Sequence, residues 1–336
     1  MYGLFIAKVV TALLALIFVV AIVGSGRKKD DGPSLKITNL NDKYRDLKTS
    51  VLQTLMDKKE FKALTKEQTK TNKKEKKSAK VVVQKPKLFV LNFDGDIRAS
   101  EVETMRDEVT AVLAVAQPQD EVIMRLDNSG GIVHEHGLAA SQLQRIKDAN
   151  LKFTISVDKV AASGGYMMAC VADKIIAAPF AILGSIGVLA QLPNFHRLLD
   201  KVGVDWEQHT AGEYKRTVTM FGENSDKERE KLKLDLQETH VLFRDFVSEN
   251  RSKLNIDKVS TGEHWYGKQA LELNLVDDLI TSDEYLINAL DEFEIFEVSM
   301  EIKQNFQDKF LGGLFSSVEK ARNGLADTAH KAQFKK

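Results

Sequence analysis

Short apolar runs alternate with amphipathic stretches through the middle of the chain, and this alternation limits the possible folds more than any other feature. Runs rich in strand-forming side chains occur at 87–93, 121–126, 152–158 and 174–178. The stretches between them carry turn residues and apolar positions at helical spacing. Strands that are joined by helical crossovers pair in parallel. We therefore predict an α/β domain built on a parallel sheet.

Further elements are predicted from local signals. Ser100 and Glu103 have the spacing of a capping box, which predicts a helix from there to about residue 115. The other predicted elements are helices at about 137–149, from Ser163 onward, at 226–250, 267–273 and 283–290, and a last strand near 295–298. This pattern places the folded domain at residues 87–300.

The N-terminal segment is a candidate membrane anchor. Residues 2–26 are apolar and are interrupted by a single charge, Lys8. At about 1.5 Å per residue, a helix of this length crosses the roughly 30 Å hydrocarbon core of a bilayer. The run is too long for a cleavable signal peptide, and it has no polar stripe that would face water in a globular fold. We predict one transmembrane helix at 1–26, in contact with membrane lipid.

The charges that flank this segment predict its orientation. Arg27, Lys28 and Lys29 follow the apolar run directly, whereas Lys8 and the amino terminus are the positive charges at its other end. Basic residues are retained on the cytoplasmic side of a span. The flanks therefore favour a cytoplasmic location for the rest of the chain.

The regions on either side of the domain are polar. Residues 27–86 form a Lys-rich linker whose run at 66–80 cannot bury enough apolar surface to fold alone. A helix is expected within 40–64, where apolar residues recur at helical spacing. The lysine run is suited to anionic lipid or nucleic acid, but a solvated tether explains it as well. Residues 301–336 are expected to form an amphipathic C-terminal tail.

Composition argues against several classes of function. The formal net charge is zero, so there is no electrostatic case for nucleic acid as a partner. The single cysteine, Cys170, excludes an intrachain disulfide framework and a cysteine-rich zinc site, and no metal or other cofactor is predicted. Its apolar neighbours predict that Cys170 is a buried small side chain.

Ser163 is the first candidate for chemistry. It lies in KVAASGGYMMAC at 159–170, where a predicted strand passes through glycines directly into an apolar helix. The first N–H groups of a helix have no intrahelical partner and can stabilise an oxyanion. Gly164 would supply one of them, and its lack of a side chain permits close approach of a ligand. Serine is also a frequent helix N-cap, which is the alternative role for Ser163.

A second glycine-bearing loop follows a neighbouring strand. The sequence RLDNSGGIV at 125–133 places Gly130 and Gly131 directly after a predicted inner strand. The carboxyl ends of parallel strands meet at one edge of a sheet, and ligands of open α/β sheets bind there. The two loops are therefore expected to lie close together, although a turn of this kind can also be merely tight.

A base is needed to activate a serine nucleophile, and two residue types are candidates. Histidine is the usual base, and the chain has seven: His134, His136, His196, His209, His240, His264 and His330. Of these, His134 and His136 are expected on the surface. Lys215, in HTAGEYKR at 209–216, is the other candidate. A lysine accepts a proton near neutral pH only when desolvation lowers its pKa from about 10.4, so an exposed surface lysine is the alternative.

Four motifs in register decide between these candidates. NSGGIV, KVAASGGYMMACVADKI, LGSIGV at 183–188 and TAGEYKR follow one another in this order, and together they resemble the signal peptide peptidase A family of membrane-bound serine proteases. The resemblance covers about residues 87–290, together with the anchor and the basic linker. It implies a ClpP/crotonase-like fold. It also implies a Ser–Lys dyad in which Ser163 is the nucleophile, Lys215 the general base and Ser185 the hydroxyl that orients the lysine amine.

The same resemblance implies an oxyanion hole made by Gly131 and the Gly164 N–H. Ser129 stands where family members usually carry proline. Because the turn lacks that proline, Gly130 and Gly131 both remain candidates for the first donor.

The expected protein is thus a serine-type endopeptidase held by one span in a bacterial inner membrane, acting on hydrophobic peptides or on misfolded or membrane polypeptide segments. Family members assemble into homo-oligomeric rings whose serine and lysine come from neighbouring protomers, so Ser163 and Lys215 need not meet within one chain. Two alternatives remain: a crotonase-type acyl-CoA enzyme, which would need neither residue, and a non-catalytic membrane scaffold.

Overall fold

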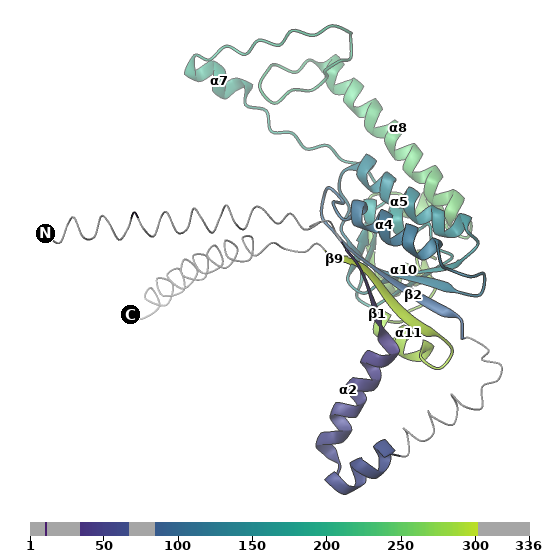
Figure 1. The fold of residues 1–336 in the computed structure, drawn as a ribbon. Coiled ribbons are helices and arrows are strands. Elements are labelled where there is room, and N and C mark those ends of the chain that lie inside the picture. Colours follow the sequence, from purple (N-terminus) through teal and green to yellow (C-terminus); the bar gives the residue numbers. More distant parts are fainter. Residues whose placement is uncertain (1–10, 12–33, 67–84, 302–336) are drawn as a thin grey trace, which may run out of the picture. The chain divides into compact units, whose positions relative to one another are not determined.

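The computed structural model describes residue 11, residues 34–66 and residues 85–301 (Figure 1). Nearly all of the predicted membrane span, of the lysine run and of the predicted C-terminal tail lies outside these residues. Within the described part of the chain, no helix is long and apolar enough to cross a bilayer. The larger of the two units into which the chain divides, Lys36–Ser299, contains every named element except the outer ends of the first and last strands.

One sheet runs through the larger unit. Over the described residues, nine strands join in the order β1-β9-β2-β3-β5-β7-β8, with β4 paired to β3 and β6. Six strand pairings are parallel (β2–β3, β2–β9, β3–β4, β3–β5, β4–β6 and β5–β7), and β7 pairs antiparallel with β8. The predicted α/β fold with a parallel sheet is confirmed. The strands are β1 Ser34–Asn39, β2 Lys87–Gly95, β3 Glu121–Asn128, β4 Lys152–Val157, β5 Val160–Ala162, β6 Lys174–Ala177, β7 Ile182–Gly184, β8 His264–Tyr266 and β9 Glu294–Glu301.

Most helices fall where their periodicity predicts them. The charged helix expected at 226–250 has these bounds, and it begins at Asp226 because Ser225 and Glu228 form a reciprocal capping box there. The helix expected within 40–64 is present as α2. The helices are α2 Leu40–Leu55, α4 Val102–Leu113, α5 Val133–Asp148, α6 Gly164–Ala169, α7 His196–Val202, α8 Asp226–Asn250, α9 Ile256–Val259, α10 Gly267–Glu272 and α11 Ser282–Ala289.

The predicted capping box at Ser100 is wrong. The hydroxyl of Ser100 donates to Asp96 Oδ2 at 2.9 Å, and its N–H donates to Asp96 Oδ1 at 3.0 Å. Glu101 therefore takes the N-cap position of α4, without a capping side-chain hydrogen bond. An acceptor four residues upstream competes successfully for the serine.

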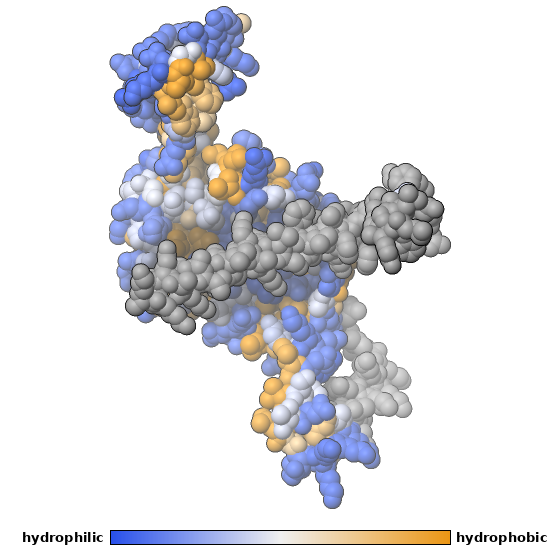
Figure 2. Space-filling view, turned by 90° about the vertical axis from the view of Figure 1, so that its left-hand side faces the viewer, coloured by the Kyte–Doolittle hydropathy of each residue, from blue (hydrophilic) through white to orange (hydrophobic). Residues whose placement is uncertain are grey.

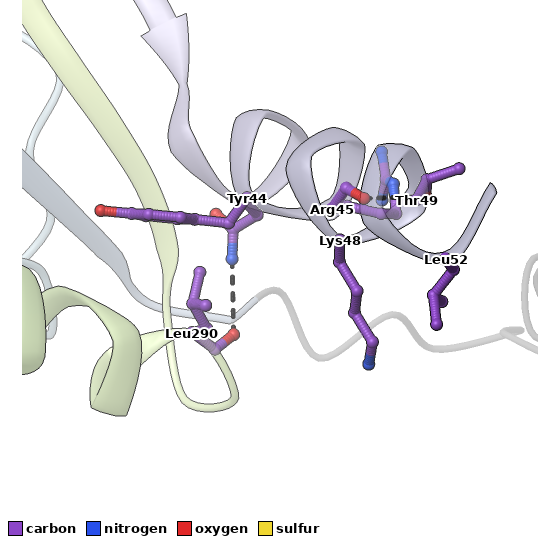
Figure 3. A pocket seen from close by; sticks show the side chains of 7 residues that line it. Tyr44, Arg45, Lys48, Thr49, Leu52 and Leu290 are labelled. Atoms are coloured by element: carbon purple, nitrogen blue, oxygen red, sulfur yellow. Dashed lines mark hydrogen bonds between the residues drawn. The ribbon is translucent and has the colours of Figure 1, made fainter. Parts of the chain in front are cut away.

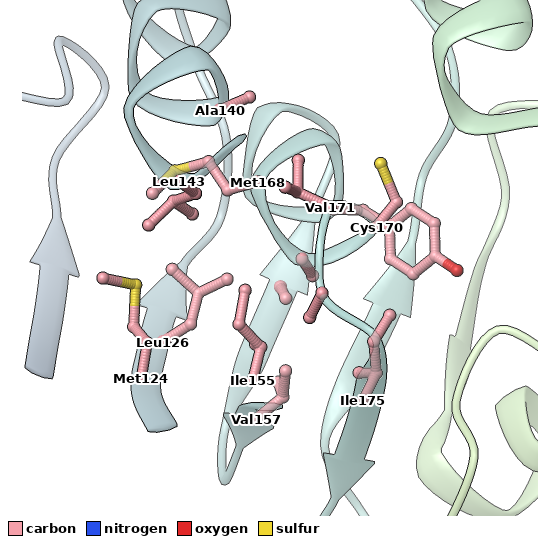
Figure 4. Close-up of a cluster of buried hydrophobic side chains, with 14 of the residues drawn as sticks. Met124, Leu126, Ala140, Leu143, Ile155, Val157, Met168, Cys170, Val171 and Ile175 are labelled. Carbon is pink, nitrogen blue, oxygen red and sulfur yellow. The ribbon is translucent and has the colours of Figure 1, made fainter. Parts of the chain in front are cut away.

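Alternate residues of the strands enter two separate cores, as the period of a strand requires. From β2, Phe89 and Leu91 belong to the main core with α4, α5 and α6, whereas Leu88 and Val90 belong to a smaller cluster with residues of α2 and α11. Figure 4 shows the part of the main core where α5 and α6 lie over the central strands. The sheet is therefore covered on both faces, and the turns at its strand ends remain available for a site.

Candidate active site

Ser163 lies at the sharp junction between β5 and α6. Its backbone has φ of 52° and ψ of −118°, a positive-φ conformation that residues other than glycine rarely adopt. Its N–H donates to the Gly184 carbonyl at 2.8 Å, and its carbonyl accepts from the Met167 N–H at 3.0 Å. The hydroxyl makes no capping hydrogen bond. A strained strand-to-helix turn that holds a partly buried serine whose hydroxyl caps nothing is typical of nucleophilic serines.

Close packing explains the two glycines that follow Ser163. A Cβ at Gly164 would lie 2.4 Å from Cγ of the His136 ring, and a Cβ at Gly165 would lie 2.2 Å from the Asn128 carbonyl oxygen. Neither position has room for a side chain. All six residues of α6 are buried, so the helix that follows Ser163 is a rigid support.

The glycine loop after β3 lies against the same turn. A Cβ at Gly130, where φ is 87°, would lie 2.7 Å from Ser163 Cβ and 2.8 Å from the Gly164 nitrogen. The expected meeting of the two glycine loops is confirmed. Gly130 is buried and its N–H donates to Asn128 Oδ1 at 2.7 Å. Gly131 is exposed, and its N–H has no hydrogen-bond partner among the residues that the structure describes.

His136 is buried beneath these loops, so its expected surface location is wrong. The side chain is 0% exposed, whereas that of His134, two residues earlier, is 82% exposed. His136 Nδ1 donates to the Ile132 carbonyl at 2.9 Å, and Nε2 lies 3.0 Å from Asn128 Oδ1. Helical periodicity would have revealed this, because residues 136, 139, 140 and 143 form the buried stripe of α5.

Ser185 follows β7, the strand next to β5. The parallel register of these strands sets Ser163 and Ser185 at adjacent strand ends. Ser185 also has a positive φ, of 51°. Its N–H donates to the Glu263 carbonyl at 2.7 Å, and its hydroxyl donates to the Gly262 carbonyl at the long distance of 3.4 Å. A second strained serine therefore lies beside the first, with a hydroxyl that is weakly engaged.

Lys215 belongs to a different kind of region, residues 189–225, which we call the arm. Lys215 is exposed, and over the described ranges its ammonium takes part in no hydrogen bond or ion pair. Its loop is fastened to α8, where Lys227 donates to Glu213 at 2.6 Å. No hydrogen bond, ion pair or ring contact between described residues joins the arm to the turn of Ser163. The structure thus brings together Ser163, Ser185 and the glycine loops, but not Lys215.

The arm exposes apolar side chains along its length. Within it, only Asn224 is buried. Phe195, Trp206 and Phe221 form an aromatic cluster with centroid distances of 6.0 and 5.1 Å, yet they are 38%, 50% and 37% exposed. Figure 2 shows apolar side chains gathered on α7 and its flanking loops, at the top of the view. Contiguous exposed apolar surface of this kind marks an interaction site.

The cavities of the described residues lie away from these serines. A crevice of about 410 Å³ opens between α2 and Leu290, where Asn41 donates to the Leu290 carbonyl at 3.4 Å (Figure 3). A smaller cavity of about 190 Å³ is lined by residues of β2 and β3, with Asp158 and Lys159. Neither is lined by Ser163. No cluster of three or more side chains suited to a metal ion occurs in the described part of the chain.

Cys170 is the C-cap of α6, and it is a small buried side chain, as its apolar neighbours predict. The thiol is 0% exposed and donates to the Met167 carbonyl at 3.2 Å. Burial raises the pKa of Cys170 to about 12. The thiol is therefore protonated at neutral pH and is not a competing nucleophile.

The α/β fold, the strained serine turn and the unengaged amide next to it are typical of serine hydrolases, and comparison with known proteins specifies the family. Residues 1–143 match Peptidase family S49 N-terminal, and residues 145–295 match Peptidase family S49. The chain belongs to peptidase family S49. The resemblance that the four motifs indicate is confirmed, and so is the prediction of a peptidase.

Curated relatives cover nearly the whole chain. "Probable protease SohB" of Haemophilus influenzae is 46% identical over 320 residues, which are 92% of this chain and 91% of the relative. "Probable protease SohB" of Buchnera aphidicola subsp. Schlechtendalia chinensis is 47% identical over 298 residues, 85% of this chain and 98% of the relative. "Protease 4" of Haemophilus influenzae is more distant, with 25% identity over 70% of this chain and 40% of its own length.

Proposed function

We propose that this family S49 peptidase is a membrane-anchored serine endopeptidase with a Ser163–Lys215 dyad that forms between neighbouring copies of the chain. The observation that carries the proposal is the turn at Ser163, whose positive φ is retained although its hydroxyl caps nothing. Backbone strain of this kind costs about 1–3 kcal/mol and persists at sites where chemistry requires the geometry.

The proposed reaction is nucleophilic acyl transfer. An uncharged Lys215 amine accepts the hydroxyl proton as Ser163 Oγ attacks a peptide carbonyl carbon. The carbon–nitrogen bond breaks, and the leaving amine takes the proton from Lys215. A water molecule, deprotonated by the same amine, then attacks the acyl-enzyme carbonyl carbon. The bond from that carbon to Ser163 Oγ breaks, Oγ takes the proton back from Lys215, and the carboxylic acid product is released. Ser185 orients the amine during these steps. These side chains and water account for every bond that forms or breaks, so the proposal includes no metal or cofactor.

The oxyanion is proposed to accept from the N–H groups of Gly131 and Gly164. Gly131 is preferred to Gly130 because the Gly130 N–H already donates to Asn128 Oδ1. The Gly131 amide is exposed and unengaged among the described residues. The Gly164 amide is the first N–H of α6, where the helix supplies no carbonyl partner.

A neighbouring copy is proposed to supply Lys215, in a homo-oligomeric ring. The exposed ammonium and the exposed apolar side chains of the arm support this, because both would become buried at an interface between copies. Burial of the amine in such an interface disfavours its charged form and thereby prepares it to act as a base.

The proposed setting is a single span in a bacterial inner membrane. Residues 2–26 would form the anchor, and the basic residues that follow favour the cytoplasmic side for the catalytic domain. Apolar side chains near the site suit extended hydrophobic peptides or misfolded membrane segments: Val133 and Leu189, which follow the glycine loop and Ser185, are 42% and 74% exposed.

A fluorophosphonate probe, which phosphonylates activated serines, tests the function directly. The full-length chain in mild detergent should label at Ser163, and Ser163→Ala should abolish the label. The control is Ser141→Ala, because Ser141 is an exposed serine whose hydroxyl donates to the Gly137 carbonyl on α5. An assembled, folded wild-type protein that takes up no label would favour the non-catalytic scaffold instead.

A further inference from the structure

Asn128 and His136 form a buried polar pair that has no part in the bond-breaking steps described above. Asn128 ends β3 and is 1% exposed, and His136 lies in the first turn of α5 and is 0% exposed. His136 Nε2 lies 3.0 Å from Asn128 Oδ1. Burying polar side chains costs free energy unless they are hydrogen-bonded. The question is what these two side chains hold in place.

Asn128 determines which amide of the glycine loop is free. Its Oδ1 accepts the Gly130 N–H at 2.7 Å, a turn of the kind that asparagine forms with the residue two positions on. The Ile132 N–H donates to the Ile97 carbonyl at 2.9 Å. Of three consecutive amides, the first and third are therefore engaged, and the middle one, that of Gly131, is left unengaged among the described residues.

His136 supports the other proposed donor. A Cβ on Gly164 would lie 2.4 and 2.6 Å from the Cγ and Cδ2 atoms of the ring, so the imidazole lies directly against the Gly164 backbone. The ring orientation is fixed by the hydrogen bond from Nδ1 to the Ile132 carbonyl, which can only accept. One buried pair thus contacts both loops from which the proposed oxyanion donors come.

The amide of Asn128 shows that this arrangement has a cost. Its Nδ2 is a buried donor without a partner among the described residues, and it lies where a Cβ on Gly95 would come within 2.2 Å. Turning the amide over would aim Nδ2 at His136 Nε2, but it would remove the acceptor of the Gly130 N–H. The structure keeps the Gly130 hydrogen bond and leaves the donor unsatisfied.

We propose that the Asn128–His136 pair positions the Gly131 and Gly164 amides for the oxyanion. This inference rests on the proposed function and extends it to two residues that touch neither the substrate nor the reacting atoms. They are positioning residues, and their loss should reduce stabilisation of the transition state more than substrate binding.

The test is peptide hydrolysis by the full-length chain, with rates expressed per active site titrated by the fluorophosphonate. His136→Phe keeps a ring against Gly164 but removes the hydrogen bond to the Ile132 carbonyl and the polar contact of Nε2 with Asn128. We expect kcat to fall about 10- to 100-fold with KM nearly unchanged, since a small displacement of catalytic groups has effects of that order. His134→Phe is the matched control on the same helix and should retain wild-type kcat.

Two substitutions at Asn128 keep the proposal testable if His136→Phe does not fold. Asn128→Leu removes the acceptor and should lower kcat about 10- to 100-fold. Asn128→Asp retains an acceptor for the Gly130 N–H, and it should stay within about threefold of wild type, a rescue that loss of packing alone would not give.

The outcomes separate this inference from the proposed function. If the variants melt at lower temperature but keep wild-type kcat per titrated site, the pair is purely structural and the inference is overturned. An equal loss of kcat in Asn128→Asp and Asn128→Leu would also overturn it. If wild-type protein is not labelled at Ser163, the proposed function fails first and the positioning role fails with it.

Discussion

The turn that holds Ser163 is enclosed by buried groups, whereas the arm that holds Lys215 is exposed along almost its whole length. Around the turn, Gly130, Gly164 and His136 are packed so closely that no Cβ fits at either glycine. In the arm, three aromatic rings pack on one another and still leave more than a third of each accessible. The two regions of the proposed site therefore differ in packing: the turn is buried and closely packed, whereas the arm is exposed and loosely packed.

The difference indicates how the site is completed. Folding of a single chain is sufficient to fix the serine and the amides, because their contacts come from β3, α5, α6 and β7 of that chain. Nothing among the described residues fixes the Lys215 ammonium in the same way. A general base has to lie within hydrogen-bonding reach of its proton. On this proposal, catalysis therefore depends on the association of two copies of the chain. Experiments that alter the turn and the arm separately can test this.

The largest expected effect comes from mixing two inactive variants. Ser163→Ala and Lys215→Ala should each lose at least about a thousandfold in activity, as expected when one member of a catalytic unit is removed. If the serine and lysine come from different copies, random mixed rings should contain about one intact site in four and recover a corresponding fraction of wild-type turnover.

Peptidase assays after dissociation and reassembly of the mixture measure this recovery. A control mixture of wild type with the Ser163→Ala/Lys215→Ala double variant reports any loss due to the procedure. Mixtures that remain as inactive as their parents, despite verified exchange of subunits, would show that both residues act within one chain.

A change confined to the turn should behave differently from one in the arm. Gly164→Ala would place a Cβ 2.4 Å from the His136 ring, so the turn must shift and activity should fall about a hundredfold. Gly137→Ala is the matched control, since nothing lies within 4 Å of a Cβ there. Because the defect belongs to the copy that supplies the serine, mixing with Lys215→Ala should restore activity and mixing with Ser163→Ala should not. Restoration by both partners would contradict the division between turn and arm.

Sequence patterns predicted those parts of the fold that are long enough to show a period. β2, β3 and β4 have 9, 8 and 6 residues that are rich in strand-forming side chains, and α8 has both helical periodicity and a capping box. β5, β7 and β8 have three residues each, too few for a pattern, and they form because neighbouring backbone groups pair with them. The capping box at Ser100 failed because Asp96 supplies a competing acceptor.

The candidate site likewise includes residues that the sequence predicted and residues that it did not. Ser163 and the glycines were predictable because a strand-to-helix junction is a local feature of the sequence, and the structure confirms the junction. The burial of His136 was missed because this residue was expected on the surface together with His134. Its place on the apolar stripe of α5 indicated instead that it is buried. The role of Lys215 stays a prediction, since its proposed partner residues belong to another copy of the chain.

The smallest expected effect concerns the fastening of the lysine loop to α8. The Tyr214 ring lies 5.7 and 5.6 Å from the ammonium groups of Lys227 and Lys231, and an exposed cation–π contact contributes about 0.5–1 kcal/mol. Tyr214→Ala should therefore loosen the loop and lower activity about two- to fivefold. The melting temperature should not change, because the ring is half exposed and lies outside both cores.

Tyr214→Phe is the control: it loses only the hydroxyl, which hydrogen-bonds the neighbouring Glu213 within the loop, and it keeps the ring face that contacts α8, so it should retain activity. A second attachment persists in both variants: the hydrogen bond from Lys227 lowers the pKa of Glu213 below its ordinary value of 4.5. A lowered carboxylate pKa means that the Glu213–Lys227 pair contributes at neutral pH and is lost only as the pH falls through that lowered value. The difference between Tyr214→Ala and wild type should thus be constant across the neutral range. Equal activity of Tyr214→Ala and wild type would show that the contacts of the Tyr214 ring with Lys227 and Lys231 do not help to position Lys215, and that the Glu213–Lys227 pair is sufficient to fasten the loop to α8.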